Sequence, residues 1–153
     1  HTSNWDFFLK LAIALDWRIN LRWLGKDSIF RAPFGGLLRR LGGIPVNRDT
    51  SSGVVEQIVQ KFAKQDELAL ALSPEGTRAD VECWKTGFYN IACQAKVPIV
   101  LAFLDYEKKV IGVGKIVYPT GDYEGDMVAV REFYDSVKGK YPKRKRATRA
   151  VSQ

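Results

Sequence analysis

Apolar residues are distributed along this chain in two different patterns. Apolar residues three and four apart are typical of a helix, and short continuous apolar runs are typical of buried strands. Runs of the second kind cover residues 68–72, 97–104 and 109–117. The clearest helical stretch begins after Ser51 and Ser52, either of which can cap it. Its apolar face comprises Val54, Val55, Ile58, Val59, Phe62 and Ala63.

The remaining segments continue this alternation of helices and strands. Ser3 to Asp6 fits a capping box that would start a helix over residues 5–15. Helical spacing also covers residues 30–41, with Pro33 marking a break or a start and Gly42-Gly43 an end. Further helices are predicted over 87–96 and 127–137, strands over 19–24 and 44–46, and a polar loop over 73–85. Strands separated by helices predict an α/β layered domain.

Length and composition indicate one domain with a real core, since 46% of the 153 residues are hydrophobic. We expect that domain to span residues 1–137. Residues 138–153 contain no acidic side chain and are dominated by Lys and Arg, so we expect a basic, mobile tail. The net charge of +7 favours nucleic acid, anionic lipid or phosphorylated metabolites as partners, without choosing among them.

Composition and residue spacing disfavour a membrane-spanning protein and a zinc protein. Residues 9–24 are rich in apolar side chains but are interrupted by charged ones, so we predict no membrane-spanning segment. Cys83 and Cys93 are not in a CxxC pair, and one histidine cannot complete a Cys/His zinc set. We therefore expect reduced thiols and no metal.

His1 and Asp6 form the first candidate for chemistry. Histidine is suited to accept a proton near neutral pH, and a carboxylate can orient its ring. Five residues of helix rotate by about 500°, so the two side chains would not share a helix face. They can converge if residues 2–4 form a turn. The alternative is that Asp6 only caps the helix and His1 lies on the surface.

A second candidate, residues 72–78, follows a predicted strand, and open α/β sheets bind ligands at strand ends. Gly76 allows close backbone approach, and Thr77 and Arg78 can hydrogen-bond a phosphate. An ordinary solvated turn is the alternative. Arg48 ends the short strand after Gly43 and is a further phosphate ligand candidate, although an exposed arginine beside a helix cap is the more usual interpretation of an isolated arginine. Lys26 and Lys85 are cations near predicted loops, with solvated lysines as the alternative.

Residues 30–41 mix aromatic, aliphatic and basic side chains, among them Phe34, Leu37, Arg39 and Arg40. This mixture suits a helix at a membrane interface. A stripe that faces the core is the competing interpretation.

Taken together, four ordered blocks resemble the PlsC-like glycerolipid acyltransferase family, which includes the 1-acylglycerol-3-phosphate acyltransferases. The H-x-x-x-x-D block is similar to His1–Asp6, and the Gly-containing strand ending in Arg to Gly43–Arg48. The P-E-G-T-R block resembles Pro74–Arg78, and the V-P-[IV]-[VI] strand resembles Val97–Val100. Lys26 before the second block, and Lys85 with Gly87 after the third, also fit. The resemblance covers residues 1 to about 120.

The resemblance implies a layered α/β domain with a mixed, largely parallel sheet flanked by helices. It implies that His1 is a general base oriented by Asp6, and that Arg48 and Arg78 hold the acceptor phosphate. Glu75, Gly76 and Thr77 would shape that site, with Lys26 and Lys85 nearby, and the fourth block would line it or support the acyl chain. Acyl-ACP or acyl-CoA would be the co-substrate, without a metal or another cofactor.

The implied partners are an acyl carrier protein or CoA thioester, a lysophosphatidic acid-like lipid and an anionic membrane surface, but no nucleic acid. The implied location is cytoplasmic, at the inner face of the cell membrane. Family members have a strand leading into the histidine, and none precedes His1 here. We interpret the chain as N-terminally truncated, and expect weak activity that upstream residues would restore.

Three other functions compete with acyl transfer to 1-acylglycerol-3-phosphate. The acceptor could be another lysolipid. A binding module could use the basic surface and tail to recognise an anionic membrane or nucleic acid, although Tyr141 is the only aromatic residue in that tail. A hydrolase could use His1 and Asp6 with water, although no G-x-S-x-G nucleophile motif is present.

Overall fold

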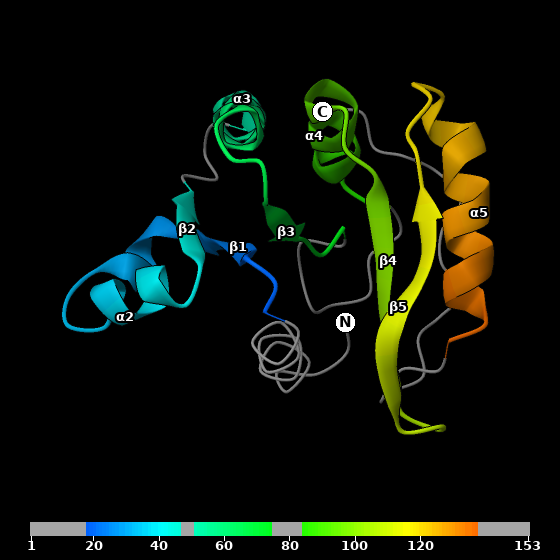
Figure 1. Ribbon diagram of the computed structural model, residues 1–153, viewed down its shortest axis with the longest axis horizontal. Coiled ribbons are helices and arrows are strands. Elements are labelled where there is room, and N and C mark those ends of the chain that lie inside the picture. The colour runs from blue at the N-terminus through cyan, green and yellow to red at the C-terminus, as the bar shows by residue number, and fades with distance from the viewer. Residues whose placement is uncertain (1–17, 47–50, 75–83, 138–153) are drawn as a thin grey trace. The chain divides into compact units, whose positions relative to one another are not determined.

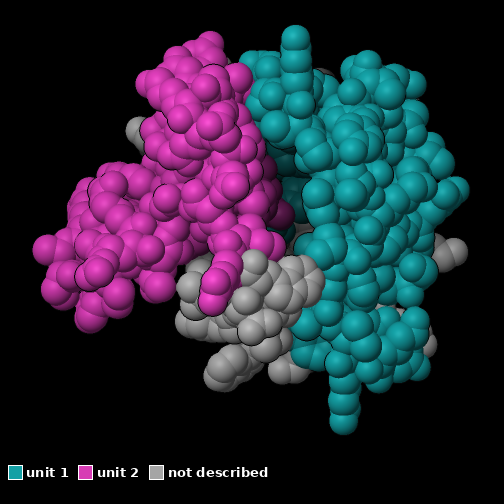
Figure 2. Space-filling view, in the orientation of Figure 1, with its two compact units in different colours: residues 1–7, 73–153 teal, residues 8–72 magenta. Residues whose placement is uncertain are grey.

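The computed structural model describes residues 18–46, 51–74 and 84–137 (Figure 1). The chain divides into two compact units (Figure 2). Unit 2 contains residues 8–72, and unit 1 contains residues 1–7 and 73–153. The described part is a mixed α/β structure, with three parallel strands in unit 2 and an antiparallel pair in unit 1. The predicted fold class is therefore confirmed.

Unit 2 is built on a parallel sheet with the strand order β2-β1-β3. Its strands are β1 (Leu21–Lys26), β2 (Gly43–Val46) and β3 (Ala69–Ala71). Parallel neighbours need crossover connections. The 3₁₀ helix η1 (Asp27–Phe30) and helix α2 (Gly35–Arg40) connect β1 to β2, and α3 (Ser51–Ala63) connects β2 to β3. Each predicted strand in this unit is present, although β3 is shorter than residues 68–72 and only half-buried.

Helix α3 has the predicted amphipathic pattern. Ile58 is completely buried, and Val54, Val55, Val59 and Phe62 are half-buried. Ala63, which we placed on the same apolar face, is exposed because it is the last residue of the helix. Burial of one stripe explains why this segment is a helix, since its sequence contains several β-branched residues that favour strands.

Within the predicted helical stretch over residues 30–41, Phe30 ends η1 and α2 covers only Gly35–Arg40, with the break around Pro33. Phe30 is buried and stacks on Trp23 with ring centroids 5.7 Å apart. Gly43 leaves room for it, because a Cβ there would lie 2.5 Å from Phe30 Cε1. Gly42 ends α2 with a φ of 84°, a conformation that favours glycine. The glycine pair therefore serves both the helix end and the packing of Phe30.

Unit 1 consists of an antiparallel hairpin and two helices. The strands are β4 (Ile99–Asp105) and β5 (Val110–Val117), and the helices are α4 (Gly87–Ala95) and α5 (Tyr123–Asp135). Figure 1 shows α5 lying along β5. The core of this unit comprises Tyr89, Leu101, Val117, Met127 and Val130. The two strands and both helices agree with the sequence predictions to within a few residues.

Strand β4 is not buried on both faces, as its continuous apolar run predicted. Leu101 is 2% exposed on the core face, whereas Val100 is 48% exposed. Its partner Ile116 in β5 and the nearby Val113 are also about half exposed. An antiparallel pair can pack one face on helices and leave the other open, which a parallel sheet between two helix layers cannot.

A hydrogen-bond network around Tyr89 and Asp126 joins α4 to the start of α5. The Tyr89 hydroxyl donates to Asp126 Oδ2 at 2.7 Å, and Thr120 N donates to the same oxygen at 2.7 Å. Thr120 Oγ1 donates to Asp126 Oδ1 at 3.1 Å, and Gly121 N donates to Tyr89 Oη at 3.0 Å. Burial and the bond to Asp126 raise the pKa of Tyr89, while the Thr120 N–H and the Tyr89 hydroxyl lower that of Asp126.

Replacing Asp126 with asparagine should lower the free energy of unfolding by about 1–2 kcal/mol near neutral pH, because three neutral donors on Tyr89 and Thr120 lose a charged acceptor. The folded pKa of Asp126 lies below its ordinary value of 3.8. The wild-type advantage is therefore full above that value and is lost as pH falls through the folded pKa. Urea unfolding at several pH values measures this. The matched control is Asp135→Asn, at an exposed position in the same helix. An unfolding free energy of Asp126→Asn equal to that of wild type at neutral pH would contradict the assignment.

Candidate functional site

Lys26 lies at the carboxyl end of β1, where open α/β sheets place ligands. It is exposed, and the parallel register pairs it with Val46, the last residue of β2. Arg48 follows Val46 by two residues in the sequence. The strand register therefore brings Lys26 to the edge of the sheet from which the second block leaves. Lys26 and Arg48 were predicted separately as cations, and the pairing of Lys26 with Val46 is the structural feature that relates Lys26 to the second block.

Lys85 lies close in space to the first residue of the third block. Its backbone N–H donates to the carbonyl oxygen of Pro74 at 2.9 Å, and its side chain is exposed. The third block begins at Pro74, so Lys85 lies beside its first residue although eleven positions separate them in the sequence. The role of Lys85 at a phosphate site stays a prediction from the sequence.

The other predicted site residues lie outside the described part of the chain. They are His1, Asp6, Arg48, Glu75, Gly76, Thr77 and Arg78. Their assignments remain predictions from the sequence. The described structure includes parts of three of the four blocks. These parts are Gly43–Val46 of the second block, Pro74 of the third, and the whole of the fourth.

The fourth block joins helix α4 to strand β4. Lys96 ends the helix in the left-handed conformation, with a φ of 55°. Val97 N then donates to the carbonyl oxygen of Ala92 at 3.1 Å, which directs the chain into the strand. Ile99 packs against the core of unit 1, while Val100 is exposed on the opposite face. Ile99 therefore has a structural role, whereas Pro98 and Val100 are the exposed residues of this block.

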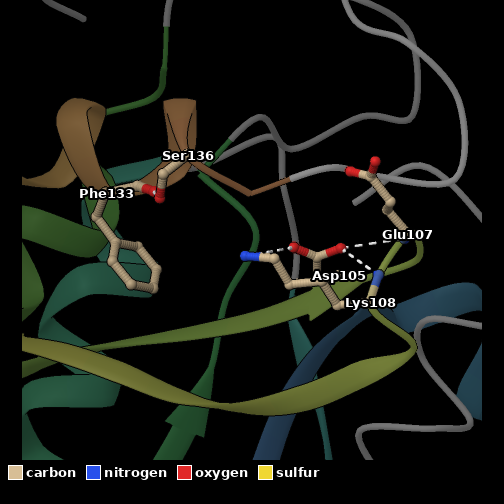
Figure 3. A network of polar contacts seen from close by, with 5 residues as sticks. All are labelled: Asp105, Glu107, Lys108, Phe133 and Ser136. Atoms are coloured by element: carbon tan, nitrogen blue, oxygen red, sulfur yellow. Dashed lines mark hydrogen bonds and ion pairs between the residues drawn. The ribbon is translucent and has the colours of Figure 1, made fainter.

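Asp105 is a buried carboxylate that the sequence analysis did not single out. It lies at the end of β4 and is 4% exposed. Its Oδ1 accepts hydrogen bonds from the backbone N–H groups of Glu107 and Lys108, each at 3.0 Å, and Oδ2 lies 3.8 Å from Lys108 Nζ (Figure 3). An aspartate that bonds backbone donors two and three residues ahead is typical of a turn. The sequence could therefore have indicated this role of Asp105, since the residue directly precedes the turn between two predicted strands.

No candidate metal site or membrane-spanning helix is present in the described residues. No group of three or more His, Cys, Asp or Glu side chains within residues 18–46, 51–74 and 84–137 is arranged to hold a metal ion. None of the helices in those same ranges is both long enough and apolar enough to cross a membrane.

The described fold is a mixed α/β structure in which the exposed Lys26 lies at the carboxyl end of a parallel strand. The family model for acyltransferases matches residues 1–102 of the 153-residue chain. The chain belongs to the acyltransferase family. Comparisons with curated proteins and with solved structures gave no match. Family membership makes the protein an acyl-transferring enzyme, with an acyl donor and a lipid acceptor in general terms.

Proposed function

We propose that the protein transfers a fatty acyl group from acyl-ACP or acyl-CoA to the free hydroxyl of 1-acylglycerol-3-phosphate, a step of phospholipid biosynthesis. The observation that carries the proposal is the extent of the family match. Residues 1–102 contain all four blocks, in the order and at the spacings that the resemblance requires. The donor, the acceptor and the roles of individual residues below belong to this proposal.

The reaction needs a base because the acceptor hydroxyl is neutral. His1 takes the hydroxyl proton as the oxygen attacks the thioester carbonyl, and Asp6 holds the ring and stabilises the imidazolium. The tetrahedral intermediate then expels the thiolate. His1 returns the proton to the sulfur, so the products are the ester and the free thiol. Binding both substrates in one complex also increases the reaction rate, because their reacting atoms are already oriented.

The acceptor phosphate needs cations, and four are proposed to hold it. Arg48 and Arg78 can each bind it in bidentate fashion, and Lys26 and Lys85 add point charges. Within unit 2, Lys26 lies opposite Val46, two residues before Arg48 in the sequence, and within unit 1 the backbone of Lys85 is bonded to Pro74, the first residue of the third block. Glu75, Gly76 and Thr77 are proposed to shape the loop around the phosphate.

We also propose that the enzyme works on the cytoplasmic face of the cell membrane, as a peripheral protein. A lysophosphatidic acid-like acceptor resides in a bilayer, and the net charge of +7 suits a surface of anionic lipid. Its protein or nucleotide partner is an acyl carrier protein or a CoA thioester. No further cofactor enters the proposed reaction, because deprotonation and phosphate binding use side chains of the chain itself.

A radiolabelled acyl donor tests the reaction class. With 1-acylglycerol-3-phosphate present, we expect labelled phosphatidic acid and an equal amount of free thiol. Labelled free fatty acid that forms at the same rate with or without acceptor would favour a hydrolase. No loss of thioester under any condition, together with salt-sensitive binding of anionic vesicles or nucleic acid, would favour a binding module.

A further inference from the structure

Helix α2 and the turn before it present apolar side chains to solvent. Phe34 is 68% exposed and Leu37 is 57% exposed. Residues three apart lie on the same side of a helix, so these two side chains are neighbours. Leu38 and Leu41 are only half-buried, and they supply the inward side of the same segment. The core-facing interpretation of this stretch is therefore wrong for Phe34 and Leu37.

Exposed arginines flank these two apolar residues in the sequence. Arg31 precedes Phe34 by three positions, Arg40 follows Leu37 by three, and both are exposed. Arg39 is also exposed, with its guanidinium carbon 5.5 Å from the centre of the Phe30 ring. Between residues 26 and 46 the sequence has four cations and a single acidic residue, Asp27. The exposed apolar pair thus belongs to a segment whose charge is mainly positive.

We propose that Arg31, Phe34, Leu37 and Arg40, here called the docking ridge, bind the surface of an anionic bilayer. Exposed apolar side chains gain by entering the acyl boundary of a bilayer, while flanking arginines attract anionic headgroups. An aliphatic leucine beside a single aromatic ring does not form a stacking platform, so nucleic acid is the weaker candidate. This proposal rests on the proposed function in one respect: the lipid acceptor is the reason for choosing a bilayer as the partner.

Two contacts within unit 2 join the docking ridge to strand β1, which carries Lys26. Trp23 Nε1 of β1 donates to the carbonyl oxygen of Leu41 at 2.9 Å, which fixes the end of α2 to the sheet. Phe30, packed against Trp23 and Gly43, fixes the other end. Figure 1 shows α2 beside β2, the edge strand next to β1. Binding through α2 would therefore hold the strand ends that carry Lys26, and lead to Arg48, at a set depth relative to the headgroups.

Co-sedimentation with vesicles tests the docking ridge directly. The probes are phosphatidylcholine vesicles with and without phosphatidylglycerol. Wild type should bind only the mixed vesicles. Arg31→Gln with Arg40→Gln should weaken binding by about fivefold for each arginine. Phe34→Ser with Leu37→Ser should weaken it by about tenfold or more, since the apolar contribution is lost.

The hairpin of unit 1 provides matched controls, because Val113 and Ile116 are exposed to a similar extent. Val113→Ser with Ile116→Ser, and Lys108→Gln with Lys109→Gln, should bind mixed vesicles like wild type. Circular dichroism melting confirms that each variant folds. Wild-type vesicle affinity in both ridge variants would overturn the proposal, as would loss of affinity only in the hairpin variants. Ridge variants that lose binding of a DNA oligonucleotide but keep vesicle binding would overturn it as well.

Measurements of turnover with a soluble and with a vesicle-bound acceptor distinguish failure of this proposal from failure of the proposed function. With a short-chain lysophosphatidic acid below its micelle concentration, the ridge variants should keep wild-type turnover, since no bilayer is needed. With the acceptor in vesicles they should be slower by the same factor as their loss of binding. Absence of turnover by wild type on either acceptor would refute the proposed reaction, while co-sedimentation would still decide the docking ridge.

Discussion

Replacing His1 with alanine is expected to lower the rate of acyl transfer by about 10²- to 10⁴-fold, the contribution usual for a general base. The acceptor hydroxyl would then have to lose its proton to water while attacking the thioester. Affinity for the acyl donor should change little, because the imidazole acts on the acceptor oxygen. Initial rates with labelled acyl-CoA and 1-acylglycerol-3-phosphate measure the effect.

Asp6→Asn examines the second member of the pair. It preserves the shape of the side chain but removes the charge that orients and stabilises the imidazolium, so a large part of the His1 effect should be reproduced. Asp16→Asn, outside the H-x-x-x-x-D block, is the matched control and should transfer acyl groups at the wild-type rate. Wild-type transfer by His1→Ala would show that the mechanism is wrong.

Replacing Arg78 with alanine should reduce kcat/KM for 1-acylglycerol-3-phosphate by about 10- to 100-fold, and Arg48→Ala should do the same. A hydrogen bond to a charged group contributes about 1.5–3 kcal/mol, and removing the guanidinium leaves a phosphate oxygen without its donor. Lysine at either position should recover only part of the loss, because it cannot bind in bidentate fashion. Steady-state kinetics with varied acceptor concentration give the comparison.

The acceptor itself supplies the control for these arginines. With a monoacylglycerol, which has no phosphate, Arg78→Ala and wild type should differ by much less. Arg144→Ala, in the basic tail, should leave both acceptors unaffected, since that residue is outside every block. An equal loss on both acceptors would mean that Arg78 supports the fold or the donor rather than the phosphate.

The pattern of apolar residues was sufficient to predict most of the described helices and strands, because these have a strong period or a strong stop signal. Ile58 and its neighbours in α3 show the first, and Gly42 after α2 shows the second. The sequence could not show that β4 has one open face. A continuous apolar run fits both a doubly buried parallel strand and one strand of a hairpin, and the pairing of Val100 with Ile116 is a long-range choice.

The same limit applies to the helical stretch over residues 30–41 and to the candidate site. Spacing predicted a helix there, but it could not show that Phe30 would be buried against Gly43 while Phe34 faced solvent. For the site, the motifs identified Lys26 and Lys85 as cations near loops. Only the register of β1 with β2, and the bond from Lys85 to Pro74, connect them to the second and third blocks. Contacts between distant segments are what local patterns leave out.

We propose that the protein acylates a lipid acceptor that it selects through a phosphate. Competition between two acceptors that differ in this phosphate measures the selection. The wild-type protein is given labelled acyl donor and an equal mixture of 1-acylglycerol-3-phosphate and monoacylglycerol, and the two products are separated and counted. We predict that labelled phosphatidic acid exceeds labelled diacylglycerol by at least about tenfold, which is the selectivity one charged hydrogen bond can supply. Equal labelling of the two acceptors, or labelling of neither, would contradict the claim.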